Sequence, residues 1–191
     1  MTAESTVHRS TVAYPGGLSV RYRWAGSAHA DEVFALSESG GTLVDHGSLV
    51  SPSPDRLCRA EMRVESPAGA WTARFASPIF DGPTAFFWDV PGLLVVKYGF
   101  VAYALDARTG ALHWTRKGGS PILDILGSAR LTHVLVQSEV ETAAVRADGD
   151  VAWRLAHGDV VTDASLVGGR LVLTMFGGST VSLDPATGQP T

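Results

Sequence analysis

The chain has 191 residues, of which 45% are hydrophobic and 18% are charged, a composition typical of a folded globular protein and unlike that of a disordered one. Its formal net charge of −4 argues against a nucleic-acid binder, because phosphate binding depends on an excess of cationic side chains. The single cysteine, Cys58, excludes an intrachain disulfide. Because no apolar run reaches about 18 residues and the N-terminus lacks a signal-peptide pattern, we expect a cytoplasmic protein without membrane contact.

The N-terminal part of the chain, after a predicted disordered tail at residues 1–10, shows the pattern of short strands. The predicted strands are Thr11–Tyr14, Leu18–Trp24, Glu32–Leu36 and Leu43–Val50. The second of these alternates apolar and polar side chains, which places one face in the core and the other in water. The turn residues Pro15, Gly16 and Gly17 join the first two strands into a hairpin.

The clearest alternation in the chain spans residues 58–65. Its apolar positions are Cys58, Ala60, Met62 and Val64, and its charged positions are Arg59, Glu61, Arg63 and Glu65. This period of two predicts a strand with Cys58 in the core and the charged face in water. Ser53, Pro54 and Asp55 could also start a helix here, but the unbroken alternation favours the strand.

Three later runs, Leu93–Tyr98, Val134–Val136 and Leu171–Met175, are almost uniformly apolar. Short apolar runs beside glycine or proline are typical of strands that are buried on both faces. No window of ten or more residues has the pattern of an amphipathic helix. The sequence therefore predicts a nearly helix-free chain.

Tryptophan marks an internal repeat in the chain. Trp71, Trp114 and Trp153 are 43 and 39 residues apart. A second marker runs in phase, because Ser77-Pro78-Ile79 follows the first tryptophan as Ser120-Pro121-Ile122 follows the second. A period of about 40 residues is that of one four-stranded blade of a β-propeller.

A turn motif accompanies this repeat. The segment Leu105-Asp106-Ala107-Arg108-Thr109-Gly110 precedes Trp114, and Leu183-Asp184-Pro185-Ala186-Thr187-Gly188 repeats it near the end of the sequence. With these residues the chain resembles the PQQ-enzyme-like (quinoprotein-type) β-propeller repeat family over roughly residues 60–191. The middle copy, Val145-Arg146-Ala147-Asp148-Gly149, has a shorter turn, and the copy at Val64 keeps only the glycine and the tryptophan.

The repeat residues are expected to have structural roles. They are Trp71, Asp106, Gly110, Trp114, Trp153, Asp184 and Gly188. The aspartates can accept hydrogen bonds from backbone N–H groups ahead of them, and the glycines can adopt the positive φ that closes the hairpin. The tryptophans are expected to pack between neighbouring sheets.

The predicted fold is an all-β, small β-propeller of about four to five blades. Its domain spans residues 11–191, with repeat units at approximately 31–75, 76–118, 119–160 and 161–191, and with 11–24 as a hairpin that closes the last blade. Closure of this kind removes exposed sheet edges. The alternative is a separate N-terminal β-domain before residue 75, followed by a partial propeller.

The resemblance does not bring the cofactor of the quinoprotein dehydrogenases with it. Those enzymes need an eight-bladed body, a metal site and a dedicated catalytic aspartate, and 191 residues at about 40 per blade cannot form eight blades. His29 with Asp31 and Glu32, and Asp45 with His46, supply too few donors for a metal site. No nucleophile elbow or phosphate-binding loop is present. We therefore expect no catalytic residue, no metal and no cofactor.

Aromatic residues near turns are the candidates for a binding surface: Phe87, Trp88, Tyr98 and Phe100. The sequence favours a non-enzymatic protein-binding module, of a scaffold, regulatory or immunity type, with another protein as its partner. One alternative is a lectin-like propeller that binds a glycan or another small ligand. A second is a hydrolase with a funnel active site that contains Asp31, Asp45 and His46.

Overall fold

The computed structural model describes residues 6–191, and the side chains of all of these except residues 35–39. Its sixteen strands form four sheets, and the only helical segments in this described range are of the 3-10 type. None of those segments is long and apolar enough to span a membrane. The prediction of an all-β, nearly helix-free, propeller-like chain is confirmed.

The residues group into two compact units. The first contains the chain up to Pro83 together with Leu105–Ala111, and the second contains Thr84–Ala104 and Leu112–Thr191. The division falls close to residue 75, where the alternative prediction places the end of a separate β-domain. The repeat-unit boundaries given above stay predictions.

The first unit contains one sheet with the strand order β1-β2-β4-β5-β3. Its strands are β1 (His8–Tyr14), β2 (Leu18–Ala25), β3 (Thr42–Asp45), β4 (Cys58–Ser66) and β5 (Gly69–Ser77). All neighbours are antiparallel except β3, which pairs parallel to β5. The preference for a strand at residues 58–65 is confirmed, and only Pro54–Arg56 before it forms a single 3-10 turn, η4.

The N-terminal hairpin belongs to this first sheet, so the prediction that residues 11–24 complete the last blade is wrong. Strand β2 pairs with β4 over seven positions, and the sheet at the C-terminal end contains only β14, β15 and β16. The cross-strand pairs Val20–Val64 and Tyr22–Met62 give the physical reason. The two alternating patterns bury their apolar faces on the same side when the strands are neighbours.

Strand β1 begins at His8, inside the range predicted to be a disordered tail. Residues 1–5 of that predicted tail lie outside the described residues. Pairing with β2 accounts for the strand that starts at His8, because each residue from His8 to Tyr14 has a partner in the hairpin.

The region predicted as strands at 32–36 and 43–50 is mostly 3-10 helix. Segment η2 covers Ser27–Ser39, and β3 ends at Asp45 before the short segment η3 (Gly47–Leu49). Ala30 and Val33 are both buried, and a separation of three residues places them on one side of a helix with three residues per turn. A strand would not bury this pair on one face.

The charged face of β4 is buried, against the prediction that it lies in water. Arg59 and Glu61 are fully buried and Arg63 nearly so, because segment η2 packs over β4. The Phe34 ring of η2 lies 4.0 Å from the guanidinium carbon of Arg74 and 5.1 Å from that of Arg59. Cys58, predicted to lie in the core, is only half-buried.

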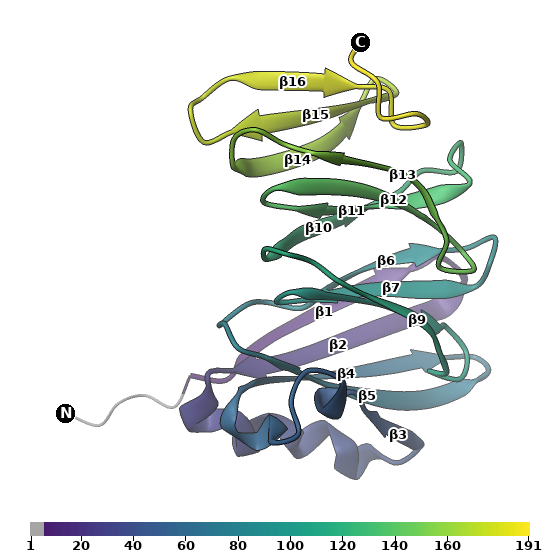
Figure 1. The fold of residues 1–191 in the computed structure, drawn as a ribbon. Helices are drawn as coiled ribbons and strands as arrows, with labels where there is room; N and C mark the ends of the chain where they lie inside the picture. Colours follow the sequence, from purple (N-terminus) through teal and green to yellow (C-terminus); the bar gives the residue numbers. More distant parts are fainter. Residues whose placement is uncertain (1–5) are drawn as a thin grey trace. The chain divides into compact units, whose positions relative to one another are not determined.

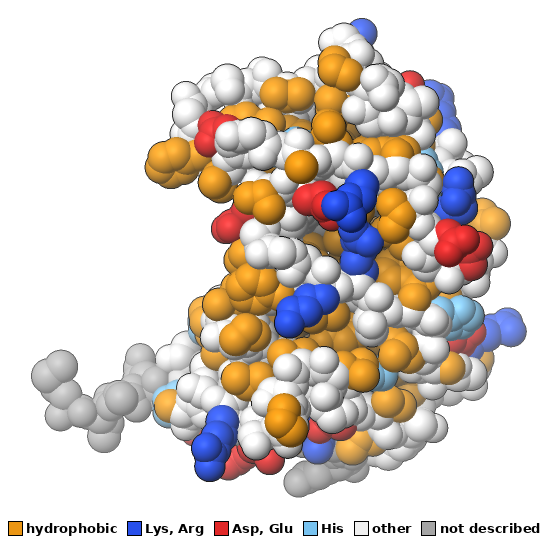
Figure 2. Space-filling model, in the orientation of Figure 1, with side chains coloured by type: hydrophobic (Ala, Val, Ile, Leu, Met, Phe, Trp, Pro, Cys, Tyr) orange, Lys and Arg blue, Asp and Glu red, His pale blue; other side chains and the backbone are white. Residues whose placement is uncertain are grey.

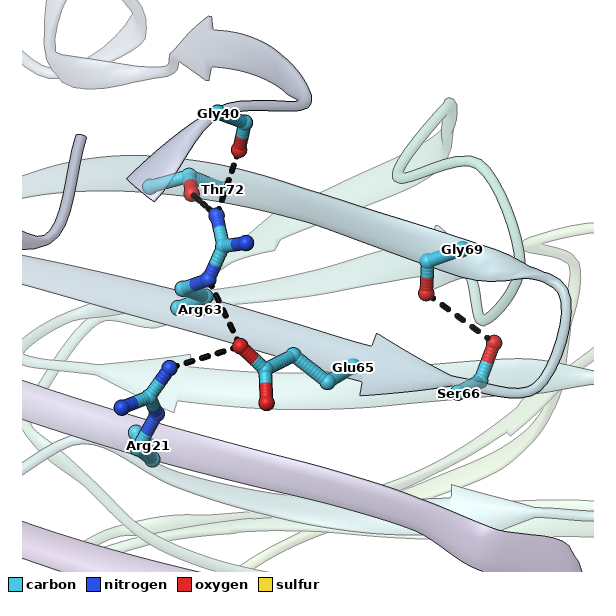
Figure 3. A network of polar contacts seen from close by, with 7 residues as sticks. All are labelled: Arg21, Gly40, Arg63, Glu65, Ser66, Gly69 and Thr72. Carbon is cyan, nitrogen blue, oxygen red and sulfur yellow. Dashed lines mark hydrogen bonds and ion pairs between the residues drawn. The ribbon is translucent and has the colours of Figure 1, made fainter. Parts of the chain in front are cut away.

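The buried charged side chains beneath η2 form ion pairs, although Arg59 Nε, Arg59 Nη1 and Glu61 Oε1 have no hydrogen-bond partner among the described residues. Glu61 Oε2 accepts a hydrogen bond from Arg74 Nε at 2.8 Å, and Arg59 Nη2 donates to Asp45 Oδ2 at 2.7 Å. Figure 3 shows the outer part of the network, in which Glu65 lies between Arg21 and Arg63. The hydrogen bond from Arg63 and the neighbouring guanidinium charges hold the pKa of Glu65 below its ordinary value.

The second unit is built from three successive sheets, and Figure 1 shows them one above another in chain order. The strands of the first are β6 (Thr84–Trp88), β7 (Leu93–Tyr98), β8 (Val101–Asp106) and β9 (Leu112–Lys117). Those of the second are β10 (Ile122–Leu126), β11 (His133–Ser138), β12 (Glu141–Arg146) and β13 (Val151–Ala156). Those of the third are β14 (Val161–Val167), β15 (Arg170–Met175) and β16 (Thr180–Leu183).

Two apolar cores separate these sheets. Val134 and Val136 on β11 belong to the core shared with β6–β9, whereas Leu135 between them belongs to the core shared with β14–β16. The run Val134–Val136 is therefore buried on both faces, as predicted, and so is Leu93–Tyr98. The run Leu171–Met175 is buried on alternate residues only, because its sheet has a neighbour on one side within this unit.

Candidate functional site

The repeat residues lock consecutive hairpins together. Trp71 Nε1 donates a hydrogen bond to the carbonyl of Ala107 at 3.0 Å, and Trp153 Nε1 donates to the carbonyl of Pro185 at 3.2 Å. Each acceptor is the residue after the motif aspartate in the next repeat. In these two cases the tryptophan of one repeat therefore donates a hydrogen bond to the turn of the repeat that follows it.

The motif aspartates hold these turns in shape. Asp106 Oδ1 accepts hydrogen bonds from the backbone N–H of Arg108 at 2.9 Å and of Thr109 at 2.8 Å. Asp184 Oδ1 accepts one from the backbone N–H of Ala186 at 2.8 Å. Their carboxylates are thus occupied within the turn, which is a structural role.

The motif glycines have positive φ and lie directly under a tryptophan. A Cβ at Gly110 would lie 2.6 Å from the Trp71 ring, and a Cβ at Gly188 would lie 2.6 Å from the Trp153 ring. The middle repeat differs, because the atom nearest to a Cβ at Gly149 would be Trp114 Cβ and not the six-membered ring. Its shorter turn closes with a hydrogen bond from Gly149 N to Arg146 O, three residues back.

This difference leaves a polar atom of the middle repeat without a hydrogen bond. Trp114 Nε1 is buried and has no partner among the described residues. The carbonyl that would correspond to those of Ala107 and Pro185 belongs to Ala147. Ala147 also lines a surface pocket that is described next.

An open pocket of about 530 Å³ lies at the turn end of the first two sheets of the second unit. Its walls come from the end of β6 and the β6–β7 turn, from the β10–β11 loop, and from Ala147 in the β12–β13 turn. The lining residues are Phe86, Phe87, Trp88, Asp89, Val90, Pro91, Ser128, Ala129, Leu131, Thr132 and Ala147. Most of these side chains are apolar, so the pocket suits an apolar group of a ligand or partner.

A second open pocket, of about 390 Å³, lies at the next repeat boundary. Its lining residues are Ser128, Arg130, Leu131, Leu166, Gly169, Asp184, Pro185 and Ala186. Pro185 takes the place that Ala147 has in the first pocket, so equivalent turns build both. Ser128 and Leu131 line both pockets, and the β10–β11 loop is their common wall. We call the two pockets together the turn-end groove.

Two of the four predicted site residues line this groove. Phe87 is partly exposed and Trp88 is largely buried in its wall. Tyr98 has no exposed area and belongs to the core, and Phe100 is half-buried outside the groove. The aromatic pattern gave no sign of Arg130, Leu131 or Ala147, which enter the groove from turns that lie far apart in the sequence.

The other residues singled out in the sequence have local partners. His29 Nδ1 lies 3.0 Å from Glu32 Oε1. Asp45 pairs with Arg59 and also accepts a hydrogen bond from the backbone N–H of Gly47 at 2.7 Å. Within the part of the chain that is described, no three His, Cys, Asp or Glu side chains come together as metal ligands.

A polar cluster of Lys97 on β7, Asp124 on β10 and Asp163 on β14 contains a carboxyl group with a shifted pKa. Burial raises the pKa of Asp124, the hydrogen bond from the Ile125 backbone and the charge of Lys97 partly oppose this rise, and the charge of Asp163 adds to it. Asp124 Oδ1 accepts a hydrogen bond from the backbone N–H of Ile125 at 2.8 Å. Perturbed carboxylates occur at functional sites and also in structural charge networks, so the raised pKa of Asp124 does not by itself mark a site.

The molecular face in Figure 2 carries scattered charged side chains among exposed hydrophobic ones. Lys and Arg side chains do not gather there into one basic field.

Several solved structures are similar to parts of this chain. The structure of the dihydro-heme d1 dehydrogenase NirN in complex with DHE matches 69% of this chain and 33% of its own, with 18% identity and a TM-score of 0.50. BamB from Moraxella catarrhalis matches 56% of this chain and 35% of its own, with 22% identity and a TM-score of 0.45. The quinohemoprotein alcohol dehydrogenase from Comamonas testosteroni matches 52% of this chain and 19% of its own, with 19% identity and a TM-score of 0.45.

The chain thus spans about a third of the length of the NirN and BamB structures. No curated protein matches it. The family model described as outer membrane protein assembly factor BamB matches residues 31–191, which is most of the chain. The resemblance to the PQQ-enzyme-like propeller repeat is confirmed, and the chain belongs to the family of the outer membrane protein assembly factor BamB.

Proposed function

We propose that this chain is a non-enzymatic protein-binding module and that its partner docks in the turn-end groove. The observation that carries the proposal is the open apolar pocket walled by Phe86, Phe87 and Trp88. Large aromatic side chains that lose their contact with water on binding are typical anchors of protein interfaces. The description of the family as an assembly factor supports a protein as the partner.

The contacts of the chemically reactive side chains support a non-enzymatic role. Asp45, one of the residues of the hydrolase alternative, accepts hydrogen bonds from the Arg59 side chain and from the backbone N–H of Gly47. His46 is buried and stacks on Phe75, with 5.8 Å between ring centroids.

The cytoplasmic location expected from the sequence stays a prediction, and fractionation of the native cells tests it.

Site-specific photocrosslinking tests the proposal. A photoreactive amino acid replaces Phe87 in the groove, and in the control it replaces Phe176, which is 78% exposed and lines neither pocket. In native cells we expect a defined crosslinked protein from position 87 and none of the same mass from position 176. Equal crosslinking from both positions would contradict docking in the groove.

A further inference from the structure

The two pockets of the turn-end groove differ in their charged side chains. Asp89 lines the first pocket, and Arg130 lines the second. Both side chains are exposed, and among the described residues neither has an ion-pair partner. Asp184 also lines the second pocket and is negatively charged, but its Oδ1 is directed into its own turn, where it accepts the hydrogen bond from Ala186 N.

The geometry favours an elongated occupant. The pockets adjoin through a shared wall at Ser128 and Leu131, and both open to solvent. A small ligand would fill one enclosed cavity, whereas an extended segment can place successive side chains in adjoining open pockets. Charged groups at the rim of an interface fix register and select partners.

Resting on the proposed function, we propose that the groove binds an extended segment of a partner protein in which an apolar side chain lies between a basic and an acidic residue. The apolar side chain fills the pocket of Phe87 and Trp88. The basic residue lies beside Asp89, and the acidic residue lies beside Arg130. Complementary charges at the two ends fix the direction in which the segment runs through the groove.

The test selects binders from a displayed library of random peptides about 12 residues long on the full chain, then measures the affinity of the best peptide by fluorescence anisotropy. We expect enrichment of the basic, apolar, acidic order. Phe87→Ser is expected to weaken binding at least about 10-fold, and Arg130→Glu by a similar factor. Lysine in place of the acidic residue of the peptide should restore binding to Arg130→Glu. The matched control, Arg9→Glu, makes the same charge change at an exposed residue of β1 and should leave affinity within about twofold.

The outcomes separate this inference from the proposed function. Peptides that need Phe87 but ignore the charge at position 130 would overturn the charge pattern and leave protein binding in the groove intact. Peptides that are insensitive to both changes, or no selected peptide at all, would overturn both. A wild-type dimer that Phe87→Ser converts to a monomer would show that a second copy of the chain occupies the groove, and would also overturn the inference.

Discussion

At the scale of a single residue, position 188 requires glycine for two reasons, its backbone conformation and its close contact with a tryptophan ring. Its φ of 72° lies in the left-handed region, and an added Cβ would lie 2.6 Å from the Trp153 ring. Gly178, in the turn between β15 and β16, has a φ of 83° but open space around it. Alanine substitutions at the two glycines therefore distinguish the cost of backbone strain from the cost of steric contact.

We expect Gly178→Ala to cost about 1–2 kcal/mol of unfolding free energy, from backbone strain alone. Gly188→Ala should cost at least about 1 kcal/mol more, because the methyl group displaces Trp153. Urea unfolding of both variants measures the difference. Equal losses would mean that the tryptophan does not pack on the glycine.

The tryptophans allow a second comparison between repeats. Trp71→Phe removes the 3.0 Å hydrogen bond to Ala107, whereas Trp114→Phe removes an indole N–H that has no partner in the described part of the chain. A net hydrogen bond contributes about 1 kcal/mol, so the first variant should lose about that much more stability in urea melts. A larger loss for Trp114→Phe would contradict this account of the middle repeat.

The sequence was enough to identify the repeat tryptophans, aspartates and glycines. It was not enough to show that Trp71 packs on Gly110 or that Trp153 packs on Gly188. Each pair joins different repeats, and the spacing within one repeat carries no information on which ring meets which turn.

At the scale of elements, the contact between η2 and β4 makes similar ion pairs contribute unequally to stability. Glu61 is fully buried beneath η2 and pairs with Arg74, whereas Arg21 and Glu65 form a half-exposed pair. Removing one partner of a buried pair leaves an uncompensated charge. We expect Arg74→Met to cost about 3–5 kcal/mol and Arg21→Met less than about 1 kcal/mol in chemical denaturation. Similar losses would show that β4 is not covered.

Acid should destabilise the same unit through His46. Burial lowers the pKa of this histidine in the folded chain, and the charge of Asp45 only partly opposes the shift. The unfolded chain therefore takes up a proton first as the pH falls through about 6.5, so the stability that neutral His46 contributes is present above that pH and lost below it.

His46→Phe keeps an aromatic ring against Phe75 and removes the titration. Its melting temperature should fall less than that of the wild type between about pH 7.5 and about pH 5.5. His113→Phe, at an exposed residue of β9, serves as the control. An unchanged acid sensitivity in His46→Phe would exclude this histidine as the cause.

Alternation predicted β4 correctly but assigned its charged face to water. Period two separates the faces of a strand without saying what covers each face. Here the cover is a 3-10 segment, whose buried pair Ala30 and Val33 gave too short a signal to distinguish from a strand.

At the scale of the whole molecule, sequence reasoning reached the fold class and the family resemblance, because a repeat of about 40 residues is a property of the whole chain. It placed the N-terminal hairpin in the wrong sheet, since any alternating hairpin can complete an open edge. It found one wall of the groove, at Phe87 and Trp88. The remaining walls come from turns in other repeats, which only the folded chain brings together.

The most direct test of the central claim is the affinity of the crosslinked partner for three forms of the full chain: wild type, Phe87→Ser and Phe176→Ser. Both substitutions replace an exposed or partly exposed phenylalanine of the second unit, and only Phe87 lines the groove. Binding through the groove predicts an affinity loss of at least about 10-fold for Phe87→Ser and of less than about twofold for Phe176→Ser. Equal affinities for all three forms would show that the partner binds elsewhere and would contradict the account.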